Sequence, residues 1–177
     1  TAGTNKISVG SDAIGIYAKE ASGTLNIKAP IDIAASGTGT TIGIYSDGEA
    51  KVNFGDDSKL IIGTGAVGLY SSVATKFGNT FKVETGKSLE VELGQNSTFG
   101  LLNGNSGEVN VGTYLNSNPI NISNFGNGAS IFYTTGGVTA NLDQNYTVST
   151  LTAGTNTSTS VLVASNDSTV KNTATLT

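Results

Sequence analysis

The stretch TTIGIYSDG, residues 40–48, places a glycine and a tyrosine inside an apolar run and then ends at once in a turn. Nearly the same pattern occurs as DAIGIYAKE at 12–20 and as GAVGLYSSV at 65–73. Three later segments repeat it less closely: TFGLLN at 98–103, ASIFYT at 129–134 and TSVLVA at 159–164. Recurrence at a near-constant interval indicates a repeat architecture.

Two other short patterns recur in a fixed order with the first. One comprises TLNIKA (24–29), AKVNFG (50–55), FKVETG (81–86), EVNVGT (108–113) and VTANLD (138–143). The other comprises KISVG (6–10), PIDIA (30–34), KLIIG (59–63), SLEVEL (88–93), PINIS (119–123) and TVSTLT (147–152). The interval is 28 residues from Tyr17 to Tyr45 and 31 residues from Leu89 to Ile120. Apolar and polar residues alternate within each segment, which is the period of a half-buried strand.

Three short strands that repeat in order predict an all-β fold, a right-handed parallel β-helix (solenoid) with three strands per coil and about six coils. Left-handed hexapeptide solenoids use about 18 residues per coil, so the longer repeat favours the right-handed form. A β-sandwich is the alternative, but it does not explain why three patterns keep their order. No helix is expected, because Asn, Gly, Ser and Thr interrupt every candidate stretch.

Equivalent strands of a solenoid lie one above another, so each strand position forms a column of similar residues. One apolar column is expected to face the core: Ile16, Ile44, Leu69, Leu101, Phe132 and Leu162. The residues on either side are then expected to face solvent: Gly15, Gly43, Gly68 and Gly100 before it, and Tyr17, Tyr45, Tyr70 and Tyr133 after it. The reverse orientation stays open, because Ser130 and Ser160 occupy the inward site two residues before the apolar column.

The composition narrows the chemistry. The 177 residues contain no His, Cys, Met or Trp, and all nine basic residues are Lys. The chain therefore lacks the usual general base, thiol nucleophile and transition-metal ligands. A net charge of −4 without a basic cluster argues against a nucleic-acid partner. We predict no enzyme activity, no cofactor and no metal site.

Two acidic clusters are candidate sites. Asp56 and Asp57 are suited to Ca²⁺ together with turn carbonyls, but a solvated turn explains them better. Glu90 and Glu92 share one face of a strand, as a glycan-cleaving carboxylate pair does, yet no Arg or His is present to stabilise developing charge. We interpret both clusters as surface features.

The tyrosines are the candidate ligand contacts: Tyr17, Tyr45, Tyr70, Tyr114 and Tyr133. Tyr114 lies in the polar excursion at 112–119 and is expected to be exposed. Similar excursions occur at 71–80 and 152–160. The N-x-[ST] triplets at Asn96 and Asn145 are attributed to the abundance of these residues.

The repeated IGIYA and IGIYS segments, the Lys-only basic residues and the Asn-, Gly- and Thr-rich coils resemble the passenger domains of autotransporter (type V secretion) adhesins, above all the large outer-membrane adhesins of fusobacteria. The resemblance implies a β-helix displayed on the bacterial cell surface that contacts a host-cell surface protein or glycan, or partner bacteria. Family members are anchored at the outer membrane by a C-terminal barrel that residues 1–177 lack. We interpret these residues as a single β-helix segment of a longer passenger.

The sequence therefore predicts a segment of a surface-exposed adhesin that presents a binding surface on a rigid solenoid. The alternatives are a passive stalk of the same protein, and a glycan-active β-helix enzyme or phage tail protein. Unpaired strand edges at both ends predict end-to-end self-association.

Overall fold

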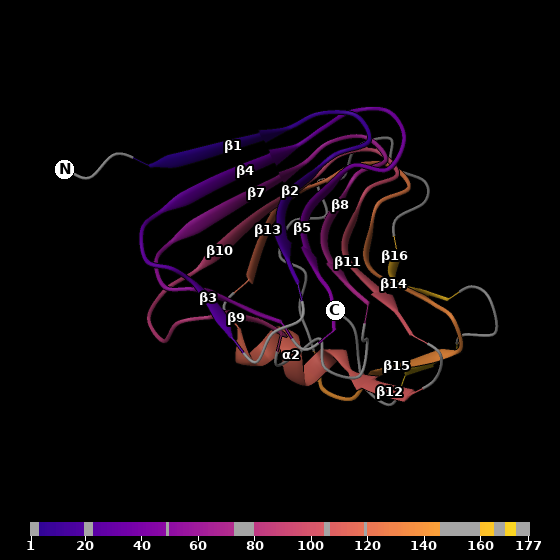
Figure 1. Ribbon diagram of the computed structural model, residues 1–177. Helices are drawn as coiled ribbons and strands as arrows, with labels where there is room; N and C mark the ends of the chain where they lie inside the picture. The colour runs from indigo at the N-terminus through magenta and orange to yellow at the C-terminus, as the bar shows by residue number, and fades with distance from the viewer. Residues whose placement is uncertain are drawn as a thin grey trace.

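The computed structural model describes residues 4–19, 23–48, 50–72, 80–104, 107–118, 120–145, 160–164 and 169–172. Within these ranges the chain is a β-solenoid of about four turns, built mostly of parallel strands with one short helix (Figure 1). The parallel β-solenoid predicted from the repeat is therefore confirmed.

Two sheets extend through most of the solenoid, and each corresponds to one predicted column of strands. Sheet A has the order β1-β4-β7-β10-β13, with strands Asn5–Val9, Ile31–Ala35, Ser58–Ile62, Leu89–Leu93 and Ile120–Phe125. Sheet B has the order β16-β14-β11-β8-β5-β2, with strands Ser160–Ala164, Ser130–Thr135, Thr98–Asn103, Val67–Ser71, Ile42–Ser46 and Ile14–Ala18. The predicted strand at 147–152 and the polar excursions at 73–79 and 152–159 lie outside the described residues.

The predicted column that begins with TLNIKA at 24–29 is split into two sheets. Sheet C contains β3 (Thr24–Ile27), β6 (Lys51–Phe54) and β9 (Phe81–Val83). Sheet D contains β12 (Gly107–Asn110), β15 (Val138–Leu142) and β17 (Thr169–Asn172). The single continuous column from TLNIKA to VTANLD, as aligned from the sequence, is therefore wrong.

Helix α2 (Val111–Ser117) follows β12 where sheet C gives way to sheet D (Figure 1). The expectation of no helix is wrong here, because Val111, Tyr114 and Leu115 recur at helical spacing and are all buried. The first-turn amide of Thr113 donates to Asp143 Oδ1 at 3.0 Å. At the other end of the helix, the Asn118 amide Nδ2 donates to the carbonyl of Tyr114 at 3.0 Å.

Asn118 also connects the helix to sheet C. Its Oδ1 accepts a hydrogen bond from the backbone N–H of Val83 at 3.1 Å. The neighbouring amide of Glu84 donates instead to Phe54 in β6. Because successive N–H groups of a strand point to opposite edges, Asn118 occupies the edge of β9 where a further strand of sheet C would pair.

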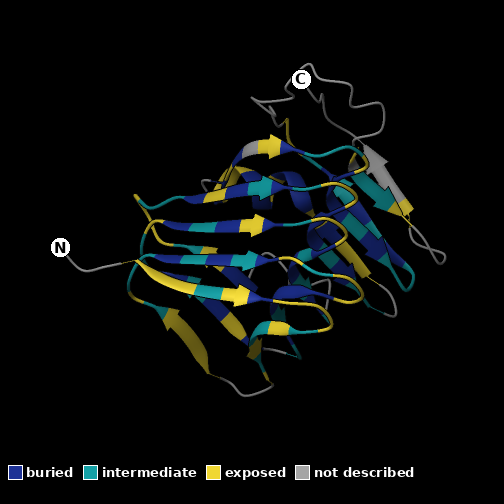
Figure 2. Ribbon diagram, turned by 90° about the horizontal axis from the view of Figure 1, so that it is seen from above, coloured by how far each residue is buried: buried dark blue, intermediate teal, exposed yellow. Residues whose placement is uncertain are grey.

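The core follows from the alternation of apolar and polar residues. In β10, Leu89, Val91 and Leu93 are fully buried, while Glu90 and Glu92 point outward. Figure 2 shows the same banding of buried and more exposed residues along the strands. The sheets thus enclose one continuous apolar interior, as expected when each coil depends on its neighbours to bury its inward face.

The predicted inward column is confirmed in most positions. Ile44 pairs with Ile16 and Leu69, and Phe132 pairs with Leu162. Leu101 is the exception: Gly100 pairs with both Leu69 and Phe132, while Leu101 belongs to the tyrosine column. The sequence alignment is wrong by one residue in β11 because it matched the glycine of TFGLLN to the glycine of TIGIYS.

The glycine column faces the core, not solvent as predicted. A Cβ atom on Gly68 would lie 2.4 Å from Ile62 Cδ1, and one on Gly15 would lie 2.6 Å from Val9 Cγ2. The same column continues with Phe99, opposite Gly68, and then with Ile131, both fully buried. A Cβ would also crowd the backbone carbonyl oxygen of the next strand, at 2.8 Å for Gly15, 2.8 Å for Gly43 and 3.0 Å for Gly68, so the earlier strands have no room for a side chain at this position.

Candidate functional site

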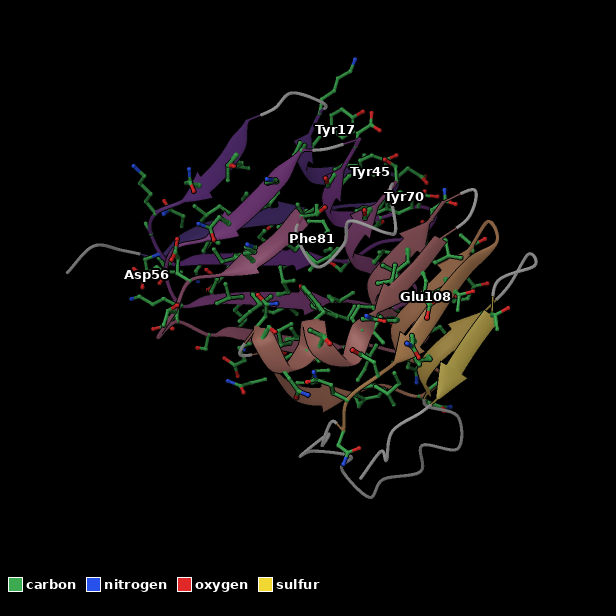
Figure 3. All side chains as sticks on the ribbon, turned by 90° about the horizontal axis from the view of Figure 1, so that it is seen from below. Tyr17, Tyr45, Asp56, Tyr70, Phe81 and Glu108 are labelled. Atoms are coloured by element: carbon green, nitrogen blue, oxygen red, sulfur yellow. The ribbon has the colours of Figure 1, made fainter. Side chains whose placement is uncertain are left out.

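The tyrosine column faces outward, which answers the question of orientation that the sequence left open. Tyr17 is 51% exposed, and Tyr45 and Tyr70 are half-buried on neighbouring strands of sheet B. The ring centroids of Tyr17 and Tyr45 are 5.2 Å apart with a tilt of 43°, and those of Tyr45 and Tyr70 are 4.5 Å apart and nearly parallel at 11°. Figure 3 shows the three rings following one another along the molecule. We call them the tyrosine strip.

Each phenol of the strip interacts with a side chain at or just beyond the end of the next strand of sheet B. Tyr17 donates to Asp47 Oδ2 at 3.0 Å, and Asn103 Nδ2 donates to the Tyr70 hydroxyl at 2.8 Å. The Ser72 hydroxyl interacts with Tyr45 and donates to Asp47 Oδ1 at 3.0 Å. Each partner lies two residues after the residue that pairs with the tyrosine on the next strand. The same spacing therefore gives three contacts between neighbouring strands: Tyr17 with Asp47, Tyr45 with Ser72, and Tyr70 with Asn103.

The electrostatics favour the neutral phenol at Tyr17 and at Tyr45. The pKa of Tyr17 is raised, first by its hydrogen bond to Asp47 and then by desolvation and the negative charge of Asp47. Burial first, then the neighbouring Tyr70 and Asp47, raises the pKa of Tyr45, although Ser72 opposes this. Rings packed against one another offer apolar contact area with fixed geometry, which is the usual contribution of tyrosine to protein interfaces.

The remaining candidate tyrosines lie in different surroundings. Tyr133 is half-buried and stands beyond Leu101, which interrupts the aromatic column. Tyr114 was expected to be exposed, and this is wrong: only 4% of it is exposed. Helix α2 turns its ring into the core, edge-on to Phe132 with centroids 6.0 Å apart, and burial raises its pKa. Tyr114 therefore presents no surface to a ligand.

The two acidic clusters are engaged in contacts within the protein. Asp56 pairs with Lys87, which lowers the pKa of Asp56, and Asp57 Oδ1 accepts from the Ser88 backbone N–H at 2.8 Å and from its hydroxyl at 3.1 Å. Across the described ranges, no three acidic, His or Cys side chains gather as metal ligands do.

Glu90 and Glu92 share one cation. Lys59 Nζ lies 2.5 Å from Glu92 Oε1 and 4.0 Å from Glu90 Oε2. The hydrogen bond to Glu92, then the charges of Glu92, Glu90 and Asp32, raises the pKa of Lys59 despite some desolvation. The carboxylates thus form a surface ion-pair group between strands.

One polar surface was missed by the sequence reasoning. An open depression of about 390 Å³ lies on sheet C and the turns after it, lined by Asn26, Lys28, Asn53, Gly55, Glu84, Thr85 and Lys87. Asn53 Nδ2 donates to Asn26 Oδ1 at 3.3 Å and to Glu84 Oε1 at 2.7 Å. The sequence signal was the asparagine that directly follows Leu25 in TLNIKA and the aligned Val52 in AKVNFG.

In the described part of the chain, no helix is both long enough and apolar enough to cross a lipid bilayer. Comparison of the sequence with protein-family models, with curated proteins and with solved structures finds no match in any of the three.

Proposed function

We propose that the chain is a segment of a bacterial surface adhesin, in which a rigid right-handed shaft of three strands per coil and about six coils holds the tyrosine strip towards a host-cell protein or glycan, or a partner bacterium. The order in which β1 to β9 alternate among sheets A, B and C supports three strands per coil. The general handedness of parallel β connections supports the right-handed form. A sequence that contains no His, Cys or Arg is better suited to binding than to acid–base or nucleophilic catalysis.

The observation that carries the proposal is the fixed geometry of the strip. Tyr45 and Tyr70 are held by stacking, and Tyr17 is held by its hydrogen bond to Asp47. These side chains are therefore fixed before a ligand binds, whereas mobile side chains would become fixed only on binding. Ordering in advance lowers the entropic cost of association. Aromatic anchors with this property commonly dominate the energy of an interface.

The test is binding of the isolated chain to epithelial cells and to bacterial cells, measured by flow cytometry. Tyr17→Ala and Tyr45→Ala are expected to weaken binding by about tenfold or more, equivalent to about 1.4 kcal/mol. Ile61→Ala is the matched control, because Ile61 is an exposed apolar residue, 38% accessible, on sheet A instead of sheet B. Circular dichroism confirms that each variant is folded. Equal binding by all three variants contradicts a role for the strip.

A passive stalk is the second candidate, and one observation favours it. All three hydroxyls of the strip interact with side chains at or just beyond the ends of neighbouring strands, so the strip also ties successive strands together. If the unsubstituted chain binds neither cell type, while Tyr45→Ala lowers its thermal midpoint, the stalk is the correct function. Release of product from a polysaccharide would instead support an enzyme.

A further inference from the structure

Among the described strands, the first three leave one end of the solenoid without a further strand. β1, β2 and β3 are the terminal strands of sheets A, B and C, and all three come from residues 5–27 (Figure 1). A terminal strand presents a row of backbone N–H and C=O groups that no neighbouring strand pairs. Three such rows at one end form a template for further parallel strands.

The side chains at this end lack the cover that the next strands have. Ile14 is 43% exposed, whereas Ile42, its partner in register, is 4% exposed. Leu25 is 42% exposed, whereas its partner Val52 is 1% exposed. Each pair occupies the same column with similar apolar residues. The difference in exposed fraction within each pair therefore measures how much apolar surface one more layer of strands would cover.

A charge column on sheet A specifies what that layer carries. Lys6, Asp32, Lys59 and Glu90 lie in register on successive strands and alternate in sign. Opposite charges directly across a strand pair stabilise the pairing, and like charges destabilise it. Continuing the alternation by one strand places a carboxylate beside Lys6.

Two more columns give the same kind of information. In sheet B the stack of Tyr70 on Tyr45 ends at Tyr17, whose ring is half exposed. In sheet C the amide contact from Asn53 to Asn26 ends at Asn26. An aromatic side chain beside Tyr17 and an amide beside Asn26 would extend both columns.

We propose that this end is an interaction surface for one further solenoid coil, added in parallel register, that brings a carboxylate beside Lys6 and an aromatic ring beside Tyr17. Residues 31–54, which supply β4, β5 and β6, have this chemistry, with Asp32, Tyr45 and Asn53 at the three positions. The coil is held by continuation of the contacts that already join the strands of the solenoid.

A second copy of the chain fits this end less well. At the far end of the described strands, β13 has Asn121 in the charge column and β16 has Val163 in the tyrosine column. The far end also closes with sheet D in place of sheet C. It therefore offers neither the carboxylate nor the ring, and its third sheet is displaced.

The test extends the full chain by one coil. Residues 1–4 are replaced by a second copy of residues 31–57, joined directly to Asn5. The junction imitates the natural step from Asp57 to Ser58, because Asn5 and Ser58 begin equivalent strands of sheet A. Hydrogen exchange followed by mass spectrometry reports on β1, β2 and β3. The matched control carries Asp32→Lys in the added copy only, which sets two lysines side by side.

The extended chain is expected to slow exchange in β1 to β3 by about tenfold or more relative to the natural chain. The control is expected to recover only part of this protection, and a smaller part at low salt. Protection of β4 to β10 verifies that the original solenoid is intact. No slowing in β1 to β3 overturns the proposal, as does equal slowing in the control. Dimers of the natural chain with protected β1 amides, seen by sedimentation, would assign the surface to a second copy and also overturn it.

Discussion

Replacing Tyr114 with alanine is expected to lower the free energy of unfolding by about 3–5 kcal/mol. The estimate follows from burial: only 4% of Tyr114 is exposed, and the substitution leaves a cavity beneath helix α2. The lost edge-on contact with Phe132 adds about 0.5–1.5 kcal/mol to the cost of lost burial. Tyr17→Ala is the comparison and is expected to cost less than about 1 kcal/mol, because Tyr17 is 51% exposed.

Urea unfolding followed by circular dichroism measures the free energy of unfolding of both variants. The slope of this free energy against urea concentration checks that both variants expose a similar surface area when they unfold. Tyr114→Phe keeps the ring and isolates the hydroxyl. If Tyr114→Ala is no less stable than Tyr17→Ala, the placement of Tyr114 in the core is refuted.

Alkaline titration tests the same burial independently. Burial raises the pKa of Tyr114, so folding favours its neutral form. The corresponding stability is present below about pH 10, the unfolded value, and is lost as the pH rises above it. Ultraviolet absorbance should show Tyr114 ionising only when the protein unfolds. Ionisation of all six tyrosines before unfolding contradicts this.

Three further substitutions probe other features. Gly68→Ala is expected to destabilise the protein by about 1–3 kcal/mol, because its Cβ would lie 2.4 Å from Ile62 Cδ1, and an unchanged thermal midpoint would show that the glycine column has room. Asp143→Asn tests the carboxylate that bonds the first turn of helix α2. Desolvation raises the pKa of Asp143, but its hydrogen bonds outweigh this effect and lower the pKa. The stability that Asp143 contributes is therefore present above about pH 4 and is lost as the pH falls through the lowered pKa. The variant should lose this part of the acid dependence of the melting temperature, and wild-type acid dependence would contradict the assignment. Lys59→Ala is expected to cost less than about 1 kcal/mol, and less again in high salt, because its partner Glu92 is accessible to solvent; a salt-independent loss would argue against an ion pair.

The sequence predicted those parts of the fold that depend on local alternation. Strands such as β10, with Leu89, Val91 and Leu93 inward, follow directly from a period of two. Register needed more than the period, because a one-residue shift in β11 moves Leu101 out of the core column and Gly100 into it. The sequence TFGLLN fits both alignments, and only the partners on the adjacent strands decide between them.

Helix α2 could not be predicted with the same certainty. Seven residues are too few to form a stable helix alone. Its first-turn amide is satisfied by Asp143, 30 residues away from Thr113, and its last turn by Asn118. The spacing of Val111, Tyr114 and Leu115 was the available signal, but it competed with the strand pattern of EVNVGT.

The sequence also contains a repeated tight turn between sheets A and B. Gly63-Thr64-Gly65-Ala66 and Gly94-Gln95-Asn96-Ser97 share a glycine first, a Gly or Asn third and a small residue fourth. The third residue has positive φ, 71° at Gly65 and 51° at Asn96, and the amide of the fourth bonds the carbonyl of the first. Residues that tolerate the left-handed region are required there.

The candidate site was predicted in part. Vertical register placed Tyr17, Tyr45 and Tyr70 in one column, and the structure confirms that alignment. The hydroxyl partners could not be read from the sequence, because each stands two residues after the neighbouring member of the tyrosine column and therefore depends on the strand register. The burial of Tyr114 could not be read either, since it depends on the unpredicted helix.

The division between sheets C and D has a mechanical consequence. Sheets A and B pass the transition without interruption, whereas on the third side β9 meets the side chain of Asn118 in place of a strand. When the two ends are pulled apart, the uninterrupted walls share the load through many backbone hydrogen bonds. We expect bending to concentrate between β9 and β12, because a side-chain hydrogen bond replaces strand pairing there.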